Sequence, residues 1–377
     1  MRNIIKSILL ALLVLLSPNF IHASKLAKMA KKSGEIRIKD VSPHKGLNLN
    51  YNYGEMELVF WDKNEIVLKY DECVRASSQK RADEILQQRI AIKSIEGHYF
   101  RVGQADDSSV SFNSKWTVYV PSHISSVAAS NSFGNITVGK GFSGLIRIDV
   151  QNGDVNIPET KAMCVVEVTH GNFYVGNAAY LNMTTKHANG TISFAQTLKV
   201  QAEHADFCKI DKADVMTINS KHSKIKVGNV GQLSSQGSYS TLEVNELSGL
   251  ANIRDMQHST IEMDKFLGKL DATDLSYSKL NITISKFNHT PFIMVTDLDY
   301  TDVKVKLPAS LRTSTYVNGK GSCRSISSGT AKIKSSAPWS SPNGVSTHVF
   351  QNTESFTPNS LIDINNESYG TILIEEY

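Results

Sequence analysis

The chain has little excess charge, few cysteines and no long hydrophobic run beyond its N-terminus, and each shortage excludes a class of protein. It carries 40 Lys and Arg against 36 Asp and Glu, a formal net charge of +4 over 377 residues. A chain so close to neutral lacks the basic surface that binds nucleic acid, so we expect no nucleic-acid partner. Its longest apolar run, Ile8–Leu16, is far shorter than the roughly 20 residues of a membrane-spanning helix.

The first residues have the order of a secretory signal peptide. Arg2 and Lys6 precede the apolar run, Pro18 follows it, and Ile21-His22-Ala23 resembles a cleavage site. We therefore expect residues 1–23 to be removed on export, which takes away Arg2 and Lys6 and lowers the net charge from +4 to +2. The mature protein is then expected in the periplasm, at the cell surface or outside the cell, without a transmembrane anchor.

A repeat organises the middle of the chain. A small or polar residue is followed two and four places later by apolar residues, as in Gly134, Ile136 and Val138. Alternate side chains of a strand share one face, and coils bury such a face by stacking, so this pattern is typical of a β-solenoid. The first residues of the repeats, 16 to 23 apart, are Gly134, Gly153, Gly171, Gly190, Asp206, Ser223, Ser240, Ser259, Ser278 and Thr301.

These observations predict a mainly β protein, a parallel β-helix with coils of about 16–19 residues and an N-terminal α+β or β cap. We divide it into a signal peptide (1–23), a capping domain with one helix near Ser78–Arg89 (24–127), the β-helix repeats (128–306), and C-terminal strands with a Ser- and Gly-rich loop at 318–345 (307–377). Nine steps of ~4.8 Å give a rod about 43 Å long.

Rings and amides recur just before the repeat anchors. These residues are Phe133, Asn152, His170, Asn189, Ala205, His222, Tyr239, His258, Tyr277 and Tyr300. In a solenoid they would be vertical neighbours, and the sequence leaves open whether they face inward or outward. Inward structural stacking is favoured, whereas an outward column would suit sugar stacking. The candidate binding ladder comprises His170, His222, Tyr239, His258, Tyr277 and Tyr300.

No catalytic, cofactor or metal site is predicted. His170 and His222 would lie roughly 14 Å apart, and His222 and His258 roughly 10 Å, too far for a shared zinc ion. Cys164 and Cys208 fall at inward repeat positions and are interpreted as core residues. With Cys73 and Cys323 they match no zinc-binding spacing, and their disulfide pairing in an oxidising compartment stays open.

An enzyme is not predicted, although some β-helix proteins degrade polysaccharides. Such enzymes need clustered carboxylates. Here Asp297 and Asp299 are the nearest approach to a pair, and we interpret them as solvated. Arg37-Ile38-Lys39 matches a polysaccharide-hydrolase tripeptide but lies at the wrong end of the chain. The irregular period argues against a hexapeptide acyltransferase, and the Gly-Gly-x-Gly-x-Asp repeat of calcium-binding proteins does not occur.

Several motifs together resemble a known family. They are Asn52-Tyr53-Gly54-Glu55-Met56, Trp61-Asp62-Lys63-Asn64, Tyr119-Val120-Pro121, Asn131-Ser132-Phe133-Gly134-Asn135-Ile136, Tyr239-Ser240, Tyr277-Ser278 and Tyr300-Thr301. Over residues 46–305 the chain resembles the exported bacterial putative-adhesin domain family of unknown function. That resemblance implies a right-handed parallel β-helix and brings no catalytic residues. The middle repeats depart from it, because His or Ala replaces Tyr and Ser replaces Gly.

Three functions remain open at this level. The first is a non-catalytic adhesin-like module that binds a glycan or a protein on the solenoid face. The second is a periplasmic structural or sensory scaffold without a ligand of its own. The third and least favoured is a carbohydrate-active enzyme whose carboxylates come together only on folding.

Overall fold

The computed structural model describes most of the chain. It covers residues 28–41, 46–89, 114–285, 292–308 and 370–377, and the strand segments 92–95, 99–102, 111–112, 314–320, 325–328, 334–335, 339–340, 345–351 and 361–366. The expected signal peptide and Cys323 lie outside these residues. No helix within the described segments has the length and hydropathy of a membrane span.

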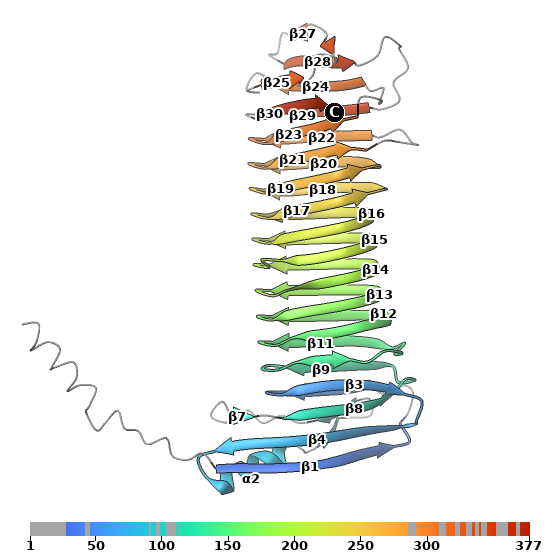
Figure 1. The fold of residues 1–377 in the computed structure, drawn as a ribbon, viewed down its shortest axis with the longest axis vertical. Coiled ribbons are helices and arrows are strands. Elements are labelled where there is room, and N and C mark those ends of the chain that lie inside the picture. The colour runs from blue at the N-terminus through green and yellow to red at the C-terminus, as the bar shows by residue number, and fades with distance from the viewer. Residues whose placement is uncertain are drawn as a thin grey trace, which may run out of the picture.

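The predicted solenoid is confirmed. Strands stack coil upon coil along the long axis of the molecule (Figure 1), with about nine turns over residues 126–284. All the strand pairs between β9 and β23 are parallel, for example Ile225 with Leu242 and Val227 with Val244, and a few contain a local shift of register. The right-handed winding implied by the family resemblance stays a prediction. The strands are β9 (Ser126–Asn131), β10 (Ile136–Val138), β11 (Leu145–Gln151), β12 (Val155–Thr169), β13 (Asn172–Lys186), β14 (Asn189–Glu203), β15 (Cys208–Lys221), β16 (Lys224–Ser238), β17 (Thr241–Leu247), β18 (Leu250–Gln257), β19 (Thr260–Phe266), β20 (Lys269–Ser276), β21 (Lys279–Ile284), β22 (Phe292–Asp299) and β23 (Asp302–Leu307).

The N-terminal region combines strands with the predicted helix. The apolar face of helix α2 consists of Ala82, Ile85 and Leu86, and these side chains are buried together with Ala30 and Val74. Strands β2 and β3 wind as a first coil, because β2 pairs in parallel with β9 and β3 pairs in parallel with β10. The elements are β1 (Lys28–Lys39), β2 (Gly46–Tyr51), β3 (Glu55–Trp61), β4 (Glu65–Ala76), α2 (Gln79–Arg89), β5 (Ile92–Ile95), β6 (Tyr99–Val102), β7 (Ser111–Phe112) and β8 (Lys115–Pro121).

A buried carboxylate ties this region together. Glu72 is fully buried and accepts hydrogen bonds from Tyr51 Oη at 2.7 Å, Ser114 Oγ at 2.5 Å, Arg89 Nε at 3.0 Å and Trp116 Nε1. Burial is also the main reason why the pKa of Tyr51 is raised. A buried charge is tolerated when it is paired and hydrogen-bonded, and this one joins β2, β4, β8 and α2.

The C-terminal strands continue the stack. Strand β22 pairs in parallel with β29, and β23 with β30, so the last strand returns to the rod as expected. Residues 318–345 were expected to form a loop, but short strands lie within this segment, and β24 pairs with β28 and β29. The strands are β24 (Ser314–Lys320), β25 (Ser325–Ser328), β26 (Lys334–Ser335), β27 (Trp339–Ser340), β28 (Val345–Gln351), β29 (Leu361–Asn366) and β30 (Thr371–Glu376).

Two repeat anchors were placed wrongly from sequence. Gly190 pairs with Phe173 and Cys208 at an inward strand position, where a Cβ atom would meet the carbonyl and ring of Phe173. Phe194, expected inside, is only half-buried. Asp206 lies one residue beyond the anchor position, because Ala188 and Ala205 directly follow the left-handed residues His187 and His204. The inward residues predicted from Asp206, Cys208 and Ile210, are nevertheless in register with Ile225 and Val227. With Ala188 and Ala205 as anchors the spacings become 19, 18, 17, 17, 18, 17, 19, 19 and 23 residues.

A hydroxyl ladder explains why Ser replaces Gly in the later coils. Ser240 Oγ donates to the carbonyl of Ser238 at 2.9 Å and accepts from the backbone N–H of Ser223 at 3.2 Å. Each hydroxyl thus closes its own turn and binds the coil below. The earlier glycines leave no such room, since a Cβ on Gly171 would lie 1.8 Å from the Gly153 carbonyl. The ladder consists of Ser223, Ser240, Ser259, Ser278 and Thr301.

The longer coils near the C-terminal end carry an extra bulge. Asp255, Asp274 and Asp297 have φ values of 49°, 57° and 53°, and the strand register places them opposite one another. Aspartate tolerates this left-handed conformation better than most residues. The bulge adds one residue to the coil, and a second is added at the preceding corner, between the pairs Val230–Leu247 and Leu233–Ala251, so the period increases from 17 to 19.

Candidate functional site

Eight rings form one unbroken column along the rod, here called the ring ladder. Neighbouring ring centroids lie 4.8–4.9 Å apart, and the interplanar angles range from 2° to 14°. That spacing equals the distance between adjacent strands, so the strand register sets the stacking. The ladder consists of His170, His187, His204, His222, Tyr239, His258, Tyr277 and Tyr300.

The backbone of each ladder residue is left-handed. Their φ values lie between 47° and 55°, at the turn that joins one strand to the next. This conformation is uncommon for residues other than glycine and costs about 1 kcal/mol or more. An aromatic contact contributes about 0.5–1.5 kcal/mol, so stacking on both neighbours offsets the cost of the turn.

The ladder faces solvent, which corrects the favoured expectation of inward stacking. All eight residues are exposed, and Tyr239 and Tyr277 are 54% and 53% exposed. The left-handed turn is the reason, because it directs the side chain away from the core while the next residue, such as Ser240, is buried. All six predicted ladder residues, His170, His222, Tyr239, His258, Tyr277 and Tyr300, lie in this column.

Two ladder residues were missed and two were assigned wrongly. His187 and His204 occupy the turns, whereas Asn189 and Ala205 do not, because the anchors beside them were out of register. A regular step of 17 residues from His170 leads to both histidines and would have found them. Nearer the N-terminus Phe133 stacks on Tyr53 as a separate pair at 4.7 Å, and Asn152 takes the turn between that pair and the ladder.

Stacking decides which ring atoms are available. The faces of an inner ring are covered by its two neighbours, so a sugar cannot stack on them as the outward alternative supposed. The ring edges remain at the surface and carry imidazole nitrogens and phenol hydroxyls, which both donate and accept hydrogen bonds. The ladder is thus a line of polar edges repeated every 4.8–4.9 Å.

The ladder in this arrangement does not form a metal centre. The missed histidines bring neighbouring imidazoles to 4.8–4.9 Å, closer than the distances expected from sequence. Parallel rings direct their lone pairs the same way rather than toward one point. Within the described part of the chain no three His, Cys, Asp or Glu side chains are arranged to hold a metal ion.

The cysteines and carboxylates singled out from sequence lie elsewhere. Cys164 and Cys208 are buried free thiols in the core, and burial raises the pKa of each to about 12. Cys73 is also free and only partly buried. Asp297 occupies a backbone bulge and accepts a hydrogen bond from Thr273 Oγ1 at 3.0 Å, so it has a structural partner.

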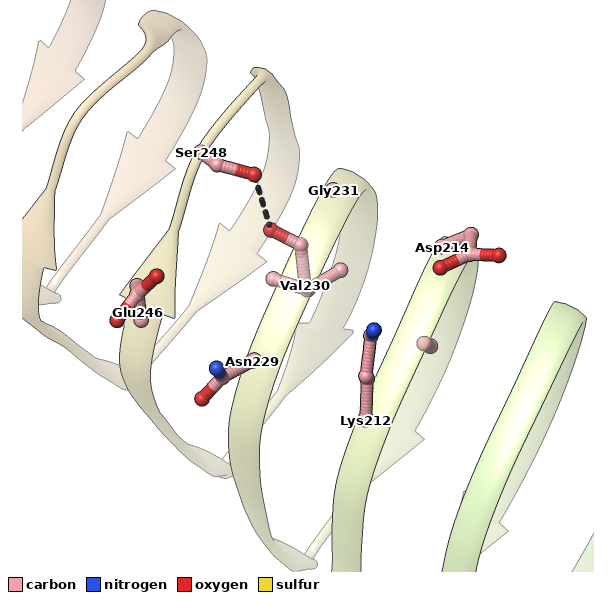
Figure 2. A pocket seen from close by; sticks show the side chains of 8 residues that line it. Lys212, Asp214, Asn229, Val230, Gly231, Glu246 and Ser248 are labelled. Carbon is pink, nitrogen blue, oxygen red and sulfur yellow. Dashed lines mark hydrogen bonds between the residues drawn. The ribbon is translucent and has the colours of Figure 1, made fainter.

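A shallow depression lies at a corner of the coils between two strand faces. This corner groove has a volume of about 300 Å³, and Figure 2 shows its side chains arriving from successive coils. Gly231 lets the two coils approach closely here, since a Cβ there would lie 2.5 Å from the Asp214 carbonyl. No sequence motif marked it. It is lined by Lys212, Ala213, Asp214, Asn229, Val230, Gly231, Glu246 and Ser248.

Charged side chains on an adjacent face form ion pairs across neighbouring coils. Lys226 pairs with Glu243 across neighbouring coils, with Nζ and a carboxylate oxygen 2.8 Å apart, and Lys224 also contacts Glu243 at 2.7 Å. The two lysines are the main reason why the pKa of Glu243 is lowered. Exposed pairs of this kind contribute at most about 1 kcal/mol.

Comparison with known proteins adds little to this geometry. The sequence matches no family model and no curated protein. Among solved structures, one described as a "putative cell adhesion protein" from Clostridium sporogenes aligns over 93% of this chain and 100% of its own, with 10% identity and a TM-score of 0.20. A similarity this distant carries no argument, and the fold assignment rests on the strand register alone.

Proposed function

We propose that this protein is an exported, non-catalytic binding rod of the adhesin-like kind, which contacts a glycan or a protein along its ring ladder. One observation carries the proposal, namely the unbroken exposed row of eight rings. Tyrosine is enriched at interfaces because it combines an apolar ring with a polar tip. The rigid spacing also means that the surface is organised before a partner arrives, which lowers the entropy cost of binding.

The location is tested first, by adding protease to intact cells. Degradation of the protein would support a surface position and therefore an adhesin-like role. Full protection, with degradation only after the outer membrane is permeabilised, would contradict that role and favour the periplasmic scaffold.

The ladder is tested next, with purified mature protein, residues 24–377, added to target cells. Replacing Tyr239 and Tyr277 by Ser removes two ring edges, and we expect binding to fall at least fivefold. The matched control replaces Tyr174, an exposed tyrosine on a different strand face, by Ser. Circular dichroism checks that each variant is folded. Equal binding by both variants would overturn the ladder as the contact surface.

A further inference from the structure

A second exposed feature, here called the apolar stripe, runs along the rod beside the corner groove. Five large apolar side chains share one register column and are 40–57% exposed. Polar Thr197 and Gln232 occupy the two coils between them. The row is therefore interrupted twice, but a group of exposed apolar side chains aligned along one face is typical of a contact surface. The stripe consists of Leu145, Met163, Tyr180, Val215 and Leu250.

Two stripe residues, Val215 and Leu250, border the corner groove, and the rest of the stripe extends beyond it along the rod. Val215 directly follows Asp214 in the chain, and Leu250 follows Gly249, which packs over Gly231. The opposite rim is polar, because Lys212, Asn229 and Glu246 are paired in register on consecutive coils. Figure 2 shows these three side chains along one side of the groove. The groove therefore separates an apolar rim from a polar one.

The chemistry of the two rims selects a type of ligand. The polar rim presents an ammonium, an amide and a carboxylate, so it offers both donors and acceptors without a large excess of charge. Sugar hydroxyls also donate and accept, and the C–H face of a sugar ring packs on apolar and aromatic side chains. Tyr180 is 57% exposed and supplies a ring in the stripe, two coils before Val215. The column from Tyr180 to Leu250 spans four coil steps, or about 19 Å.

A peptide strand fits this surface less well. A peptide that extends a sheet needs an edge strand with unpaired backbone groups. Here β15 is paired with β14 on one side and β16 on the other, and β16 is paired with β15, β17 and β18. Recognition must therefore come from side chains, as it does for carbohydrates.

We propose that the corner groove and the apolar stripe together bind a linear, uncharged oligosaccharide that lies along the rod axis. This inference deepens the proposed binding function and rests on it, but it uses a different surface from the ring ladder.

The test is a calorimetric titration of the mature protein with cellohexaose and, separately, with chitohexaose. We expect at least one to bind with a dissociation constant in the micromolar to millimolar range. Tyr180→Ser in the stripe and Asn229→Ala on the polar rim should each weaken binding at least tenfold. The matched control Tyr174→Ser removes an exposed tyrosine that lies outside both the ring ladder and the apolar stripe, and it should leave binding unchanged.

Several outcomes would overturn the inference. One is absence of binding by both oligosaccharides up to millimolar concentration, and another is equal loss of binding in Tyr174→Ser. A third is a dimer, detected by light scattering, that Tyr180→Ser converts to a monomer, since the stripe would then contact a second copy. If no oligosaccharide binds but the protein still binds cells through the ladder, only this inference fails and the proposed function stands.

Discussion

A single left-handed turn per coil places the most distinctive residues of this protein on its surface. The same turn buries the next residue, which is Gly, Ala, Ser or Thr, and so couples the ring ladder to the hydroxyl ladder. At each ladder position the left-handed backbone is unfavourable and the stacking of the ring on its neighbours is favourable. Substitutions can measure these two contributions to the free energy of folding separately.

Replacement of His204 measures both contributions. His204→Ala removes two ring contacts, and alanine has no preference for the left-handed turn. We therefore expect the free energy of unfolding to fall by about 1–3 kcal/mol. His204→Asn tolerates the turn but lacks the ring, and should be intermediate. His204→Tyr keeps both and should be nearly neutral. Urea unfolding measures the differences, and equal stability of the Ala and Tyr variants would contradict stacking as a stabilising force.

Asp149 provides a pH-dependent prediction. Partial burial, followed by the neighbouring charge of Glu167, raises the pKa of this carboxyl. A raised folded-state pKa means that the ionised form is disfavoured in the fold, so its cost is present at neutral pH and is relieved as pH falls through that pKa. Asp149→Asn should therefore be slightly more stable at pH 7, by up to about 0.5 kcal/mol, and this gain should vanish in acid.

Glu203 supplies the control with opposite sign. Its pKa is lowered, chiefly by a hydrogen bond from Lys186, so its favourable contribution exists at neutral pH and is lost as pH falls through the lowered folded-state pKa. Glu203→Gln should reduce the thermal midpoint at pH 7 and converge with the parent protein in acid. The same direction of change in both variants would contradict these assignments.

At the scale of the elements, hydrogen bonds between turns add to those between strands. The hydroxyl ladder is buried and lies in line with the backbone of the coil below, so loss of one hydroxyl affects two coils.

Ser259 is the clearest position for a test. Its hydroxyl donates to the Gln257 carbonyl at 2.8 Å and accepts from the Ser240 N–H at 3.2 Å. Ser259→Ala leaves both groups buried without this partner, and we expect a loss of about 1–3 kcal/mol in denaturant unfolding. Ser259→Thr keeps the hydroxyl, as Thr301 does at the same position of its coil, and should lose much less. Equal losses would point to packing rather than hydrogen bonding.

At the scale of the whole molecule, the rod is a one-dimensional array in which each coil contacts only its neighbours. Whole coils should therefore be removable if the register is kept.

Deletion of residues 205–239 removes two coils and joins His204 to Ser240, a turn residue to an anchor. We expect a soluble folded rod whose maximum dimension in X-ray scattering is about 10 Å shorter. The control deletes residues 205–240, one residue more, which moves inward side chains to the surface. That variant should lose cooperative unfolding. If both deletions fold equally well, register does not control this fold.

The sequence by itself determined that the chain is a β-solenoid, because alternate apolar residues at a steady period leave few other ways to bury them. It also placed six rings in one column and identified Cys164 and Cys208 as inward residues. The period failed at Gly190 and Asp206, where glycine and aspartate occur for reasons other than the turn. Only the tertiary structure decided the register there, and so added His187 and His204 to the ladder.

Orientation and surface shape also depended on the tertiary structure. The exposure of the ladder follows from the left-handed φ values of its residues. Apart from glycine, the residue type at a position does not reveal such a backbone conformation. The corner groove and the apolar stripe consist of residues about 17 positions apart, such as Lys212 and Asn229, that become neighbours only when the coils stack. Local alternation fixes which side chains enter the core, whereas the pairing of distant strands fixes which of the others meet on the surface.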